Sequence, residues 1–533
     1  MTPVKRPTSL FLEAFYCRRY NLIFGRILCY DIRNYMKKID STRLIEFFPA
    51  SIIWLTFLAA LVLSFVEPIW AVYFIIVFSV YWIVRLFYMM IWLFISWFKF
   101  RREIKINWFE KLKELPKDYL DYYHVITLPT YKEPYEVIER TFEELLKCEY
   151  PANRMIIVLG GEEGDKDNFS VIAQKIEAKY GFNFYHFMAT IHPRRPEELP
   201  GKGSNVHYME ERLKEFIDAE KLPYENIIVS CFDIETLPHQ QYFACLTYKY
   251  LTHPNPTHAS YQPLVLYNNN IWESNPIIRV VASATTFWLL TDMSRPDRLL
   301  TFSSHSMPWQ MIVDVGGHEK TIVSEDSRIC LQAIVKYDGD YEVVPMFTTV
   351  SMDTVYIGKL WQSLKNQYKQ MRRWAWGVEH TPWMWDNFFG KNANRRMPLA
   401  KRLRYFWVQL EGMYSWATAP ILILVIGRLP LLLASPADKA TAFIQNAPIT
   451  LENLMGVGMI GLILNAIMYT FVLPERPRSK SLAHWPIMMI QWVLFPVTMI
   501  IFGSIPAVEA QTRLLLSGKY RLGFWVTEKK LAK

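Results

Sequence analysis

The chain has 533 residues, of which 51% are hydrophobic and 20% are charged, and its formal net charge is +9. The charged fraction is low for a soluble protein, and the apolar residues concentrate near both ends, which favours a soluble domain set between membrane segments. The basic residues cluster beside the apolar runs, so we infer no nucleic-acid binding from the charge. The six cysteines contain no Cys-x-x-Cys pair, and neither a disulfide framework nor a zinc site is predicted.

The N-terminal part predicts a membrane-associated segment. Residues 1–45 are rich in lysine and arginine, which indicates a basic amphipathic cytoplasmic arm, with a disordered tail as the alternative. Apolar runs near 47–67 and 70–97 are each long enough to cross a bilayer, so 46–98 should form two transmembrane helices. Arg85 in the second run is costly in lipid and should face protein or a polar path. The N-terminus lacks the pattern of a cleaved signal peptide.

Residues 99–402 carry the pattern of an α/β domain. Short β-rich runs alternate with helical ones, which predicts βαβ units, a mostly parallel sheet and ligands at the carboxyl ends of its strands. The expected strands are 123–128, 155–159, 184–189 and 227–232, and the expected helices start at Pro134 and lie near 167–180 and 203–217.

Two pairs of carboxylates stand out in this domain. Asp233 and Glu235 follow an apolar strand, where residues i and i+2 point to one side and can hold a hard cation such as Mg2+ or Mn2+. Glu325 and Asp326 follow Ser324 at the expected start of a helix, where Ser324 can cap the backbone and acids suit the positive end of the dipole.

Two basic segments could contact a diphosphate. The sequence Gly201-Lys202-Gly203 could approach a phosphate, although most such sequences are ordinary turns. The sequence Gln370-Met371-Arg372-Arg373-Trp374 places an arginine, which can fork onto a diphosphate, beside an indole that can stack on a sugar ring.

The C-terminal part returns to apolar sequence. We expect 403–484 to form an interface helix and two transmembrane helices, crossing near 414–434 and 452–473. The run 485–516 is broken by Pro496, Gly503 and Pro506, so a re-entrant or interface helical pair is expected there. The basic flanks predict an even number of crossings, with both ends of the chain and the α/β domain in the cytoplasm.

These motifs together resemble the membrane-embedded family 2 glycosyltransferases, which include cellulose, chitin and hyaluronan synthases. The resemblance covers about 120–380, and more loosely the flanking membrane segments. Leu128–Pro134 is similar to the family's first nucleotide-contacting turn, Asp233 and Glu235 to its Asp-x-Asp metal motif, Ser324–Asp326 to its Thr-Glu-Asp, and Gln370–Trp374 to its Gln-x-x-Arg-Trp. The resemblance implies a GT-A, Rossmann-like domain and an inverting, metal-dependent hexosyltransferase.

The resemblance also implies roles for individual residues. Asp326 would be the catalytic base beside Glu325, and the divalent metal, Mg2+ or Mn2+, would be held by Asp233 and Glu235. Gln370, Trp374 and His305 would bind the acceptor, although His305 could equally belong to an ordinary polar loop. Residues 517–533 are similar to the gating loop of cellulose synthases at Phe524, Val526, Thr527 and Lys529. The nucleotide sugar would contact Pro129, Thr130, Tyr131, Glu133, Glu162, Lys202, Asp233 and Arg373.

Some positions depart from the family pattern. An aspartate usually follows the second strand and contacts the nucleotide base, whereas this chain has Gly160-Gly161-Glu162, so Glu162 is the candidate for this contact. A UDP-sugar donor is expected from the resemblance. Glu235 and Ser324 also differ from the family residues, but the carboxylates that the chemistry needs are kept.

The sequence therefore predicts a multi-pass enzyme of a bacterial inner (plasma) membrane that extends a polysaccharide and couples its synthesis to secretion. The alternative is a single-addition glycosyltransferase acting on a lipid carrier or glycolipid. A transporter or scaffold with a degenerate transferase domain is a third reading, against which the intact Asp326 and Arg373-Trp374 argue. The expected partners are the nucleotide-sugar donor, a polysaccharide or lipid-linked acceptor, and membrane lipids.

Overall fold

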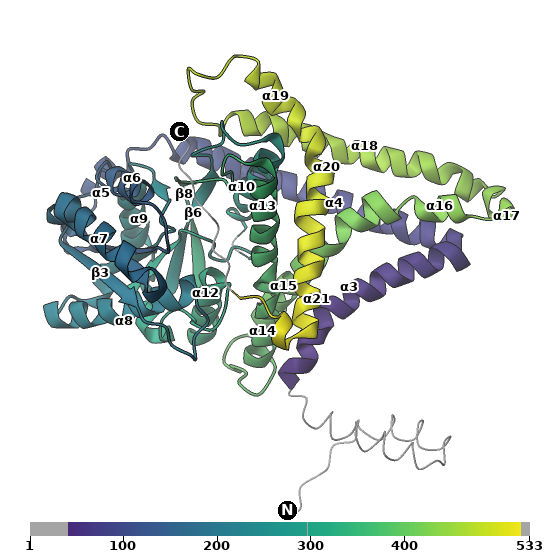
Figure 1. Ribbon diagram of the computed structural model, residues 1–533. Coiled ribbons are helices and arrows are strands. Elements are labelled where there is room, and N and C mark those ends of the chain that lie inside the picture. Colours follow the sequence, from purple (N-terminus) through teal and green to yellow (C-terminus); the bar gives the residue numbers. More distant parts are fainter. Residues whose placement is uncertain (1–40, 296, 524–533) are drawn as a thin grey trace, which may run out of the picture.

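The structure is a computed structural model and describes residues 41–295 and 297–523. An α/β domain lies beside a set of long helices that extend away from it (Figure 1). Its helices are α5 (Trp108–Lys113), α6 (Tyr135–Leu145), α7 (Lys166–Tyr180), α8 (Lys202–Glu220), α9 (Tyr242–Thr252), α10 (Pro276–Asp292), α11 (Trp309–Val315), α12 (Glu325–Lys336), α13 (Leu360–Ala375) and α14 (His380–Phe388).

The domain is built on an eight-stranded mixed sheet with the order β3-β2-β1-β4-β7-β6-β8-β5. The strands β1, β2, β3 and β4 pair in parallel, β6 and β8 also pair in parallel, and β7 and β5 are antiparallel to their neighbours. The strands are β1 (Tyr123–Pro129), β2 (Met155–Glu162), β3 (His186–His192), β4 (Ile227–Cys231), β5 (Leu237–Pro238), β6 (Ala259–Tyr267), β7 (Ser306–Pro308) and β8 (Glu342–Met352).

Two glycines show how the sheet is covered on both faces. A side chain at Gly160 of β2 would collide with Met209 of α8, and one at Gly161 would collide with Phe169 of α7. Because successive strand residues point to opposite faces, α8 and α7 pack on opposite sides of the sheet. The strand β2 between them is a continuous apolar run whose residues from Met155 to Leu159 are fully buried, as expected for a parallel strand covered on both faces.

The strand order places an open crevice at β1. The chain moves outward from β1 to β2 and β3 on one side and then returns to β4 on the other side. Such a reversal leaves a crevice at the carboxyl ends of the two central strands, where open α/β sheets bind their ligands. Thr130 follows β1 and Asp233 follows β4, so both lie at this edge.

The remaining helices carry most of the apolar surface. They are α3 (Ser41–Val66), α4 (Pro68–Glu103), α15 (Leu399–Ile421), α16 (Leu429–Leu433), α17 (Pro436–Lys439), α18 (Ala442–Thr470), α19 (His484–Ile490), α20 (Phe495–Thr498) and α21 (Ile505–Leu516). Within the described residues, five segments are long and apolar enough to cross a membrane, namely Arg43–Val66, Pro68–Glu103, Leu399–Leu433, Ala442–Thr470 and His484–Leu516.

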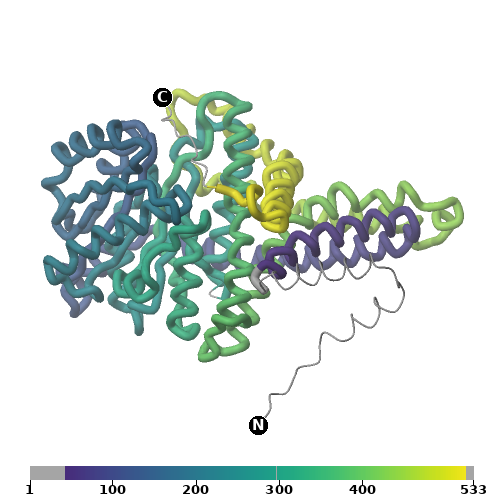
Figure 2. The backbone as a smooth tube through the Cα atoms, turned by 60° about the horizontal axis from the view of Figure 1, so that its bottom comes forward, coloured from purple at the N-terminus to yellow at the C-terminus, as the bar shows by residue number. Residues whose placement is uncertain are grey.

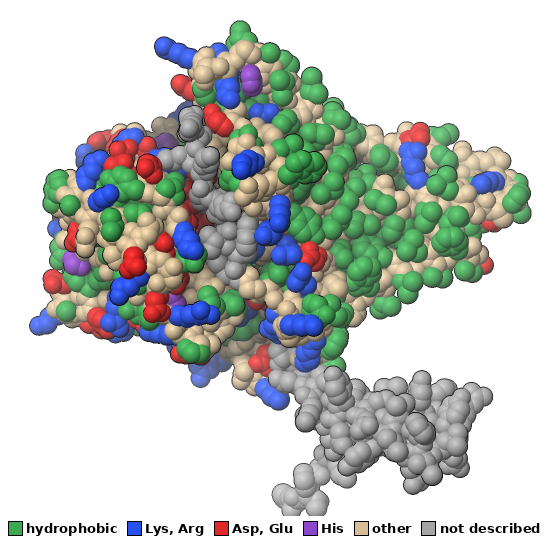
Figure 3. All heavy atoms as spheres, in the orientation of Figure 1, with side chains coloured by type: hydrophobic (Ala, Val, Ile, Leu, Met, Phe, Trp, Pro, Cys, Tyr) green, Lys and Arg blue, Asp and Glu red, His purple; other side chains and the backbone are tan. Residues whose placement is uncertain are grey.

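Large apolar side chains on these helices point outward. Hydrophobic side chains cover the surface over α3, α16 and α18 (Figure 3), and Phe65, Trp70 and Val77 are each about two-thirds exposed. A water-facing surface of this kind would be unfavourable, whereas the hydrocarbon core of a bilayer suits it. The predicted α/β domain of Rossmann-like GT-A type, inserted between apolar helices, is therefore confirmed, and these helices are consistent with a membrane protein.

The segment 485–516 differs from its prediction. Instead of two helices joined by a break, it is one helical run from α19 to α21 with a π-helical turn at Met499–Ser504. Pro496 follows a 3-10 turn at Gln491–Leu494 and Pro506 follows the π-helical turn, so the hydrogen-bond pattern changes before each proline and the run continues through it. The run stands beside α13 and crosses the direction of α4 and α18 (Figures 1 and 2).

The ends of the long helices fall into two groups. At the end remote from the sheet, the rings of Tyr73 at the start of α4 and Phe443 at the start of α18 stack with centroids 4.0 Å apart. At the near end, Arg43 Nη1 donates to the carbonyl of Leu514 at 3.0 Å. Trp272 Nε1 of the domain donates to the carbonyl of Pro474 at 3.2 Å.

We predict that Ser479 and Gly518 lie on the same side of the membrane as the sheet and that Lys439 lies on the other side. A single cysteine at each position should react with a membrane-impermeant maleimide from these sides in sealed vesicles, with the unsubstituted chain as background. Labelling of Gly518→Cys from the same side as Lys439→Cys would show that the last helical run crosses the membrane.

Candidate active site

A cavity of about 940 Å3 lies at the carboxyl ends of β1, β2 and β4. Its wall includes Thr130 and Asp233 at the sheet and continues to Trp82 of α4 and Trp416 of α15. One continuous space therefore joins the crevice of the α/β domain to the apolar helices.

Nearly all of the described candidate residues meet in this cavity. His305 is the exception among them. The candidates that line the cavity are Pro129, Thr130, Tyr131, Glu133, Glu162, Lys202, Asp233, Glu235, Glu325, Asp326, Gln370, Arg373 and Trp374.

Lys202 lies at the centre of the candidate residues. Its Nζ is 2.8 Å from Asp233 Oδ1, 2.9 Å from Asp326 Oδ1 and 3.7 Å from Glu325 Oε1. Burial alone would lower the pKa of Lys202, but the charges of Asp233, Asp326 and Glu325 raise it well above its ordinary value. The amine therefore stays protonated and links the two carboxylate motifs that the sequence places far apart.

The start of α12 is held by a residue that the sequence did not indicate. The predicted side-chain cap by Ser324 is wrong, because the Ser324 hydroxyl accepts no hydrogen bond from the backbone of the helix. Instead, Glu379 Oε1 accepts the backbone N–H groups of Val323 and Ser324 at 3.2 and 3.1 Å. Glu379 follows Trp374 by five residues, so it ties Ser324–Asp326 to the Gln-x-x-Arg-Trp helix.

Glu325 is buried beside Asp326. Burial, and then the charge of Asp326, raise the pKa of Glu325 to about 7, against a smaller opposing effect of Lys202. Asp326 itself remains partly exposed to the cavity, with 24% of its side chain accessible. Of the two carboxylates, Asp326 is the one that a substrate can reach.

Trp374 on α13 presents an aromatic surface inside the cavity. Its ring lies 5.7 Å from that of Phe302, edge to face, and 5.9 Å from that of Tyr267. Ring packing of this kind fixes the orientation of the indole at the cavity wall. Gln370 lies one turn earlier on the same helix and also lines the cavity.

The turn after β1 is stabilised by the carboxylate of Glu133, which lies within the turn. The Thr130 hydroxyl donates to Glu133 Oε2 at 2.7 Å, and the N–H of Tyr131 donates to the same oxygen. Burial raises the pKa of Glu133 above its ordinary value. Glu133 therefore shapes the turn, while Tyr131 is left to face the cavity.

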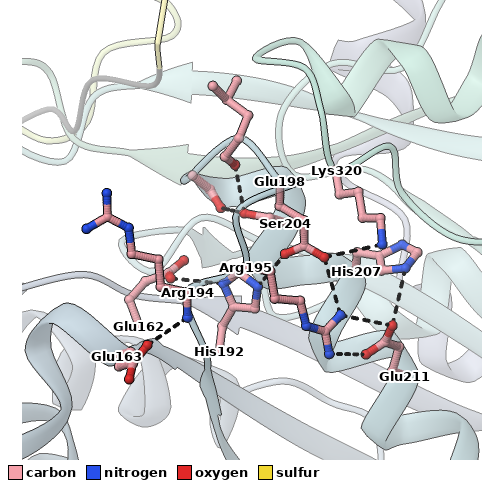
Figure 4. Close-up of polar contacts among 12 residues, drawn as sticks. Glu162, Glu163, His192, Arg194, Arg195, Glu198, Ser204, His207, Glu211 and Lys320 are labelled. Carbon is pink, nitrogen blue, oxygen red and sulfur yellow. Dashed lines mark hydrogen bonds and ion pairs between the residues drawn. The ribbon is translucent and has the colours of Figure 1, made fainter.

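A network of charged residues borders the cavity at the ends of β2 and β3 (Figure 4). His192 bridges two carboxylates, with Nδ1 at 3.0 Å from Glu162 and Nε2 at 2.8 Å from Glu198. Burial opposes the charged imidazolium, but the hydrogen bonds and charges of Glu162 and Glu198 outweigh it and raise the pKa of His192. The only hint of this network at the level of sequence is the basic turn around Arg194 and Arg195 after a strand.

His305 is placed differently from the acceptor-binding role that the resemblance implies. Its side chain is fully buried, and its Nδ1 lies 2.9 Å from the carbonyl of Phe302. Burial lowers the pKa of His305 to about 4, so the ring is neutral and donates from Nδ1. Its side chain is not part of the cavity wall, so the structure does not bring His305 together with the other candidate residues. The gating residues Phe524, Val526, Thr527 and Lys529 lie outside the described residues.

Comparison with known proteins identifies the class. Residues 228–505 match the family described as glycosyl transferase family group 2. This span is just over half of the chain, and the chain therefore belongs to this family of glycosyltransferases. The comparison with curated proteins gives no match. Among solved structures, the chain is similar to "Mannosyltransferase PcManGT from Pyrobaculum calidifontis in complex with GDP-Man and Mn2+", with a TM-score of 0.40, 13% identity, and 73% of this chain and 99% of that chain covered.

We predict that Glu325→Gln changes the pH dependence of stability. A carboxyl whose pKa is raised to about 7 by folding binds its proton more tightly in the folded chain than in the unfolded chain. The wild type therefore loses stability as the pH rises from about 4.5 to 7, and the glutamine variant lacks this loss. Its unfolding midpoint relative to wild type should rise by about 1–3 °C between pH 5 and pH 7.5.

The measurement is thermal unfolding in detergent, without added metal. Glu136→Gln, on the exposed face of α6, is the matched control and should follow the wild type at every pH. A constant difference between Glu325→Gln and wild type over this range would contradict the prediction.

Proposed function

We propose that the protein is an inverting, metal-dependent hexosyltransferase that transfers a sugar from a nucleotide-sugar donor to an acceptor held in the cavity. The observation that carries the proposal is the convergence of Asp233, Lys202, Asp326 and Trp374 on one cavity that also reaches the apolar helices. A base, cationic groups for a diphosphate and an aromatic platform for a sugar are thereby available together.

In this mechanism Asp326 is the general base. Its carboxylate accepts the proton of the acceptor hydroxyl while that oxygen attacks the anomeric carbon. The bond from the anomeric carbon to the diphosphate oxygen breaks, and the nucleoside diphosphate leaves with the bonding electrons. Attack from the face opposite the leaving group inverts the configuration. Lys202, which is 2.9 Å from Asp326, and Arg373 are the side chains that would meet the charge of the leaving diphosphate.

Asp233 and Glu235 fit a divalent cation. Both line the cavity, and the ammonium of Lys202 at 2.8 Å from Asp233 shows that this position attracts positive charge. No group of three or more His, Cys, Asp or Glu side chains that could hold a metal occurs within 41–295 and 297–523. Two carboxylates suit a Mg2+ or Mn2+ ion whose remaining coordination positions are taken by substrate phosphates. Bound in this way, the ion would neutralise charge on the diphosphate.

The donor side of the cavity would lie at the ends of β1 and β2. Pro129, Thr130 and Tyr131 form the wall beside β1, and Glu162, which also lines the cavity, would take the place of the aspartate that contacts the nucleotide base. The hydrogen bond from His192 would hold the Glu162 carboxylate in place. A UDP-sugar remains the expected donor. The acceptor side would be formed by Gln370 and Trp374, and Glu133 supports the donor turn from within.

For the acceptor, a growing polysaccharide with coupled secretion, as in cellulose, chitin and hyaluronan synthases, is the first expectation. It is supported by the aromatic residues Trp374, Trp288 and Trp416 along the cavity, because a sugar chain can step over such rings. In this case Phe524–Lys529 would act as a gate, the sheet would face the cytoplasm, and the host membrane would be a bacterial inner membrane. A single addition to a lipid carrier is the second candidate, favoured by the charged groups at the membrane-helix end of the cavity.

The test is incubation of the purified full chain with a panel of UDP- and GDP-sugars and Mg2+ or Mn2+. Nucleotide release reports transfer, and product length separates long polymer from one discrete lipid-soluble product. Absence of nucleotide release with every donor would overturn the proposal in favour of a transporter or scaffold.

We predict that Asp326→Asn lowers turnover by about 10²–10⁴-fold, because the amide cannot accept the hydroxyl proton. Nucleotide binding should stay within a few-fold of wild type, since the amide oxygen of the variant can still accept a hydrogen bond from Lys202. Asp314→Asn is the control, because Asp314 of α11 accepts a hydrogen bond from Tyr337, and neither residue lines the cavity. Turnover of Asp326→Asn close to wild type would remove Asp326 as the base.

We predict that turnover requires a divalent cation and that Asp233→Ala loses the response to added Mg2+ or Mn2+. The reason is that the substitution removes one of two carboxylates available to the ion. Turnover is followed during titration of metal into chelator-treated protein, with Asp340→Ala on the exposed surface as control. Full activity of the wild type in excess chelator would exclude the metal role.

A further inference from the structure

A second cluster of charged side chains lies at the membrane-helix end of the same cavity. Arg85 of α4 forms an ion pair with Glu411 of α15, and Arg298 Nη1 lies 3.4 Å from the other oxygen of this carboxylate. The Ser415 hydroxyl donates to Glu411 at 2.6 Å. Arg85 and Arg298 line the cavity, whereas Glu411 does not. One carboxylate thus holds two guanidinium groups side by side at the cavity wall.

The neighbouring charges leave this wall positive. Arg295 pairs with Asp292 at 3.1 Å, and Asp297 lies nearby without contacting the cavity. The six charged groups balance as a whole, but those that face the cavity are Arg85, Arg298 and Asp292. The buried Nε of Arg298 has no hydrogen-bond partner.

A purely structural role explains the cluster poorly. Charged groups at membrane depth are costly and are found where they serve a pathway or a ligand. A buried ion pair can often be replaced by apolar residues without loss of stability. Arg85 and Arg298 come from separate elements, α4 and the loop after α10, yet they converge on one point of a cavity that also contains Asp326.

We propose that Arg85 and Arg298 bind the phosphate group of a membrane-embedded lipid whose headgroup enters the cavity as the acceptor. Arginine forks match phosphate oxygens in two parallel hydrogen bonds, whereas an uncharged sugar chain needs no such cations. The apolar side chains Val84, Phe87 and Tyr88 are exposed on α4 next to Arg85 and provide the surface for the lipid chain. The inference rests on the proposed transferase function and favours its second acceptor candidate, a lipid carrier, over a growing polysaccharide, because it assigns two residues to the phosphate of that lipid.

The test measures binding without requiring turnover. Thermal unfolding of the full chain in detergent micelles is followed during titration with dioleoyl phosphatidic acid, dioleoylglycerol or inorganic phosphate. The phosphate-bearing lipid should raise the unfolding midpoint in a saturable manner, because it binds only the folded chain. The neutral lipid and inorganic phosphate at the same concentrations should leave the midpoint unchanged. An equal rise with inorganic phosphate would overturn the lipid as the source of the phosphate, and an equal rise with dioleoylglycerol would overturn the phosphate site.

Variants then locate the site. Arg85→Gln and Arg298→Gln should each weaken binding of the phosphate lipid by about 10- to 100-fold, the cost of a lost charge-assisted hydrogen bond. The affinity of Arg298→Lys for the phosphate lipid should lie between those of Arg298→Gln and wild type, because lysine keeps the positive charge but cannot form two parallel hydrogen bonds. Arg428→Gln is the matched control, since Arg428 and its partner Glu452 are exposed on the remote helices outside the cavity.

Arg85→Gln leaves Glu411 without its main partner. The double variant Arg85→Gln/Glu411→Gln removes both charges, so it tests the same site without changing the net charge of the cluster. Wild-type affinity in this double variant and in Arg298→Gln would overturn the inference.

Failure of the transferase proposal is recognised separately, by absence of nucleotide release from any donor. Where a phosphate lipid is an active acceptor, Arg298→Gln should raise the KM for the acceptor and leave the KM for the donor unchanged.

Discussion

One buried ammonium group holds the candidate active site together. Lys202 contacts Asp233 after β4 and Asp326 at the start of α12, so three segments separated by long stretches of sequence are fixed by a single side chain. The approach is possible because residue 203 is a glycine, since a side chain there would lie 2.8 Å from the carbonyl of Glu319. Without Lys202, two carboxylates would face each other in a space of low polarity, an arrangement that costs free energy unless a cation compensates it.

Buried or partly buried carboxylates also connect the α/β domain to the apolar helices. Glu509 of α21 accepts hydrogen bonds from Arg372 and Tyr368 of α13 at 2.6 and 2.7 Å. Glu379, just beyond that helix, holds the backbone before Asp326. Because α13 also carries Arg373 and Trp374, the position of the last helical run determines where these two side chains stand relative to the base. The set of apolar helices is therefore a structural support of the site as well as its border.

The first half of the sheet could be predicted because β1 to β4 are apolar runs separated by amphipathic helices. The second half could not, since β5 and β7 have two and three residues and show no period. The motif residues were recognisable because each pairs a chemical group with a strand end or helix start. Glu379 and the His192–Glu198 pair were not, because their roles come from contacts that the sequence pattern does not show. For His305, sequence alone cannot distinguish a residue in a cavity wall from one buried behind it.

The π-helical turn at Met499–Ser504 links the number of residues in the last helical run to the shape of the cavity. Phe502 and Gly503 of this turn line the cavity, and Glu509 follows on the next helix. In an α-helix each residue advances the face by about 100°. A π-helical turn holds one residue more than the corresponding α-helical turn, so deleting one residue here would restore the ordinary helical period and leave Glu509 facing Arg372. A change of one residue in chain length within this turn would therefore reshape the cavity wall at Phe502 and Gly503, while the contact of Glu509 that positions α13 is kept.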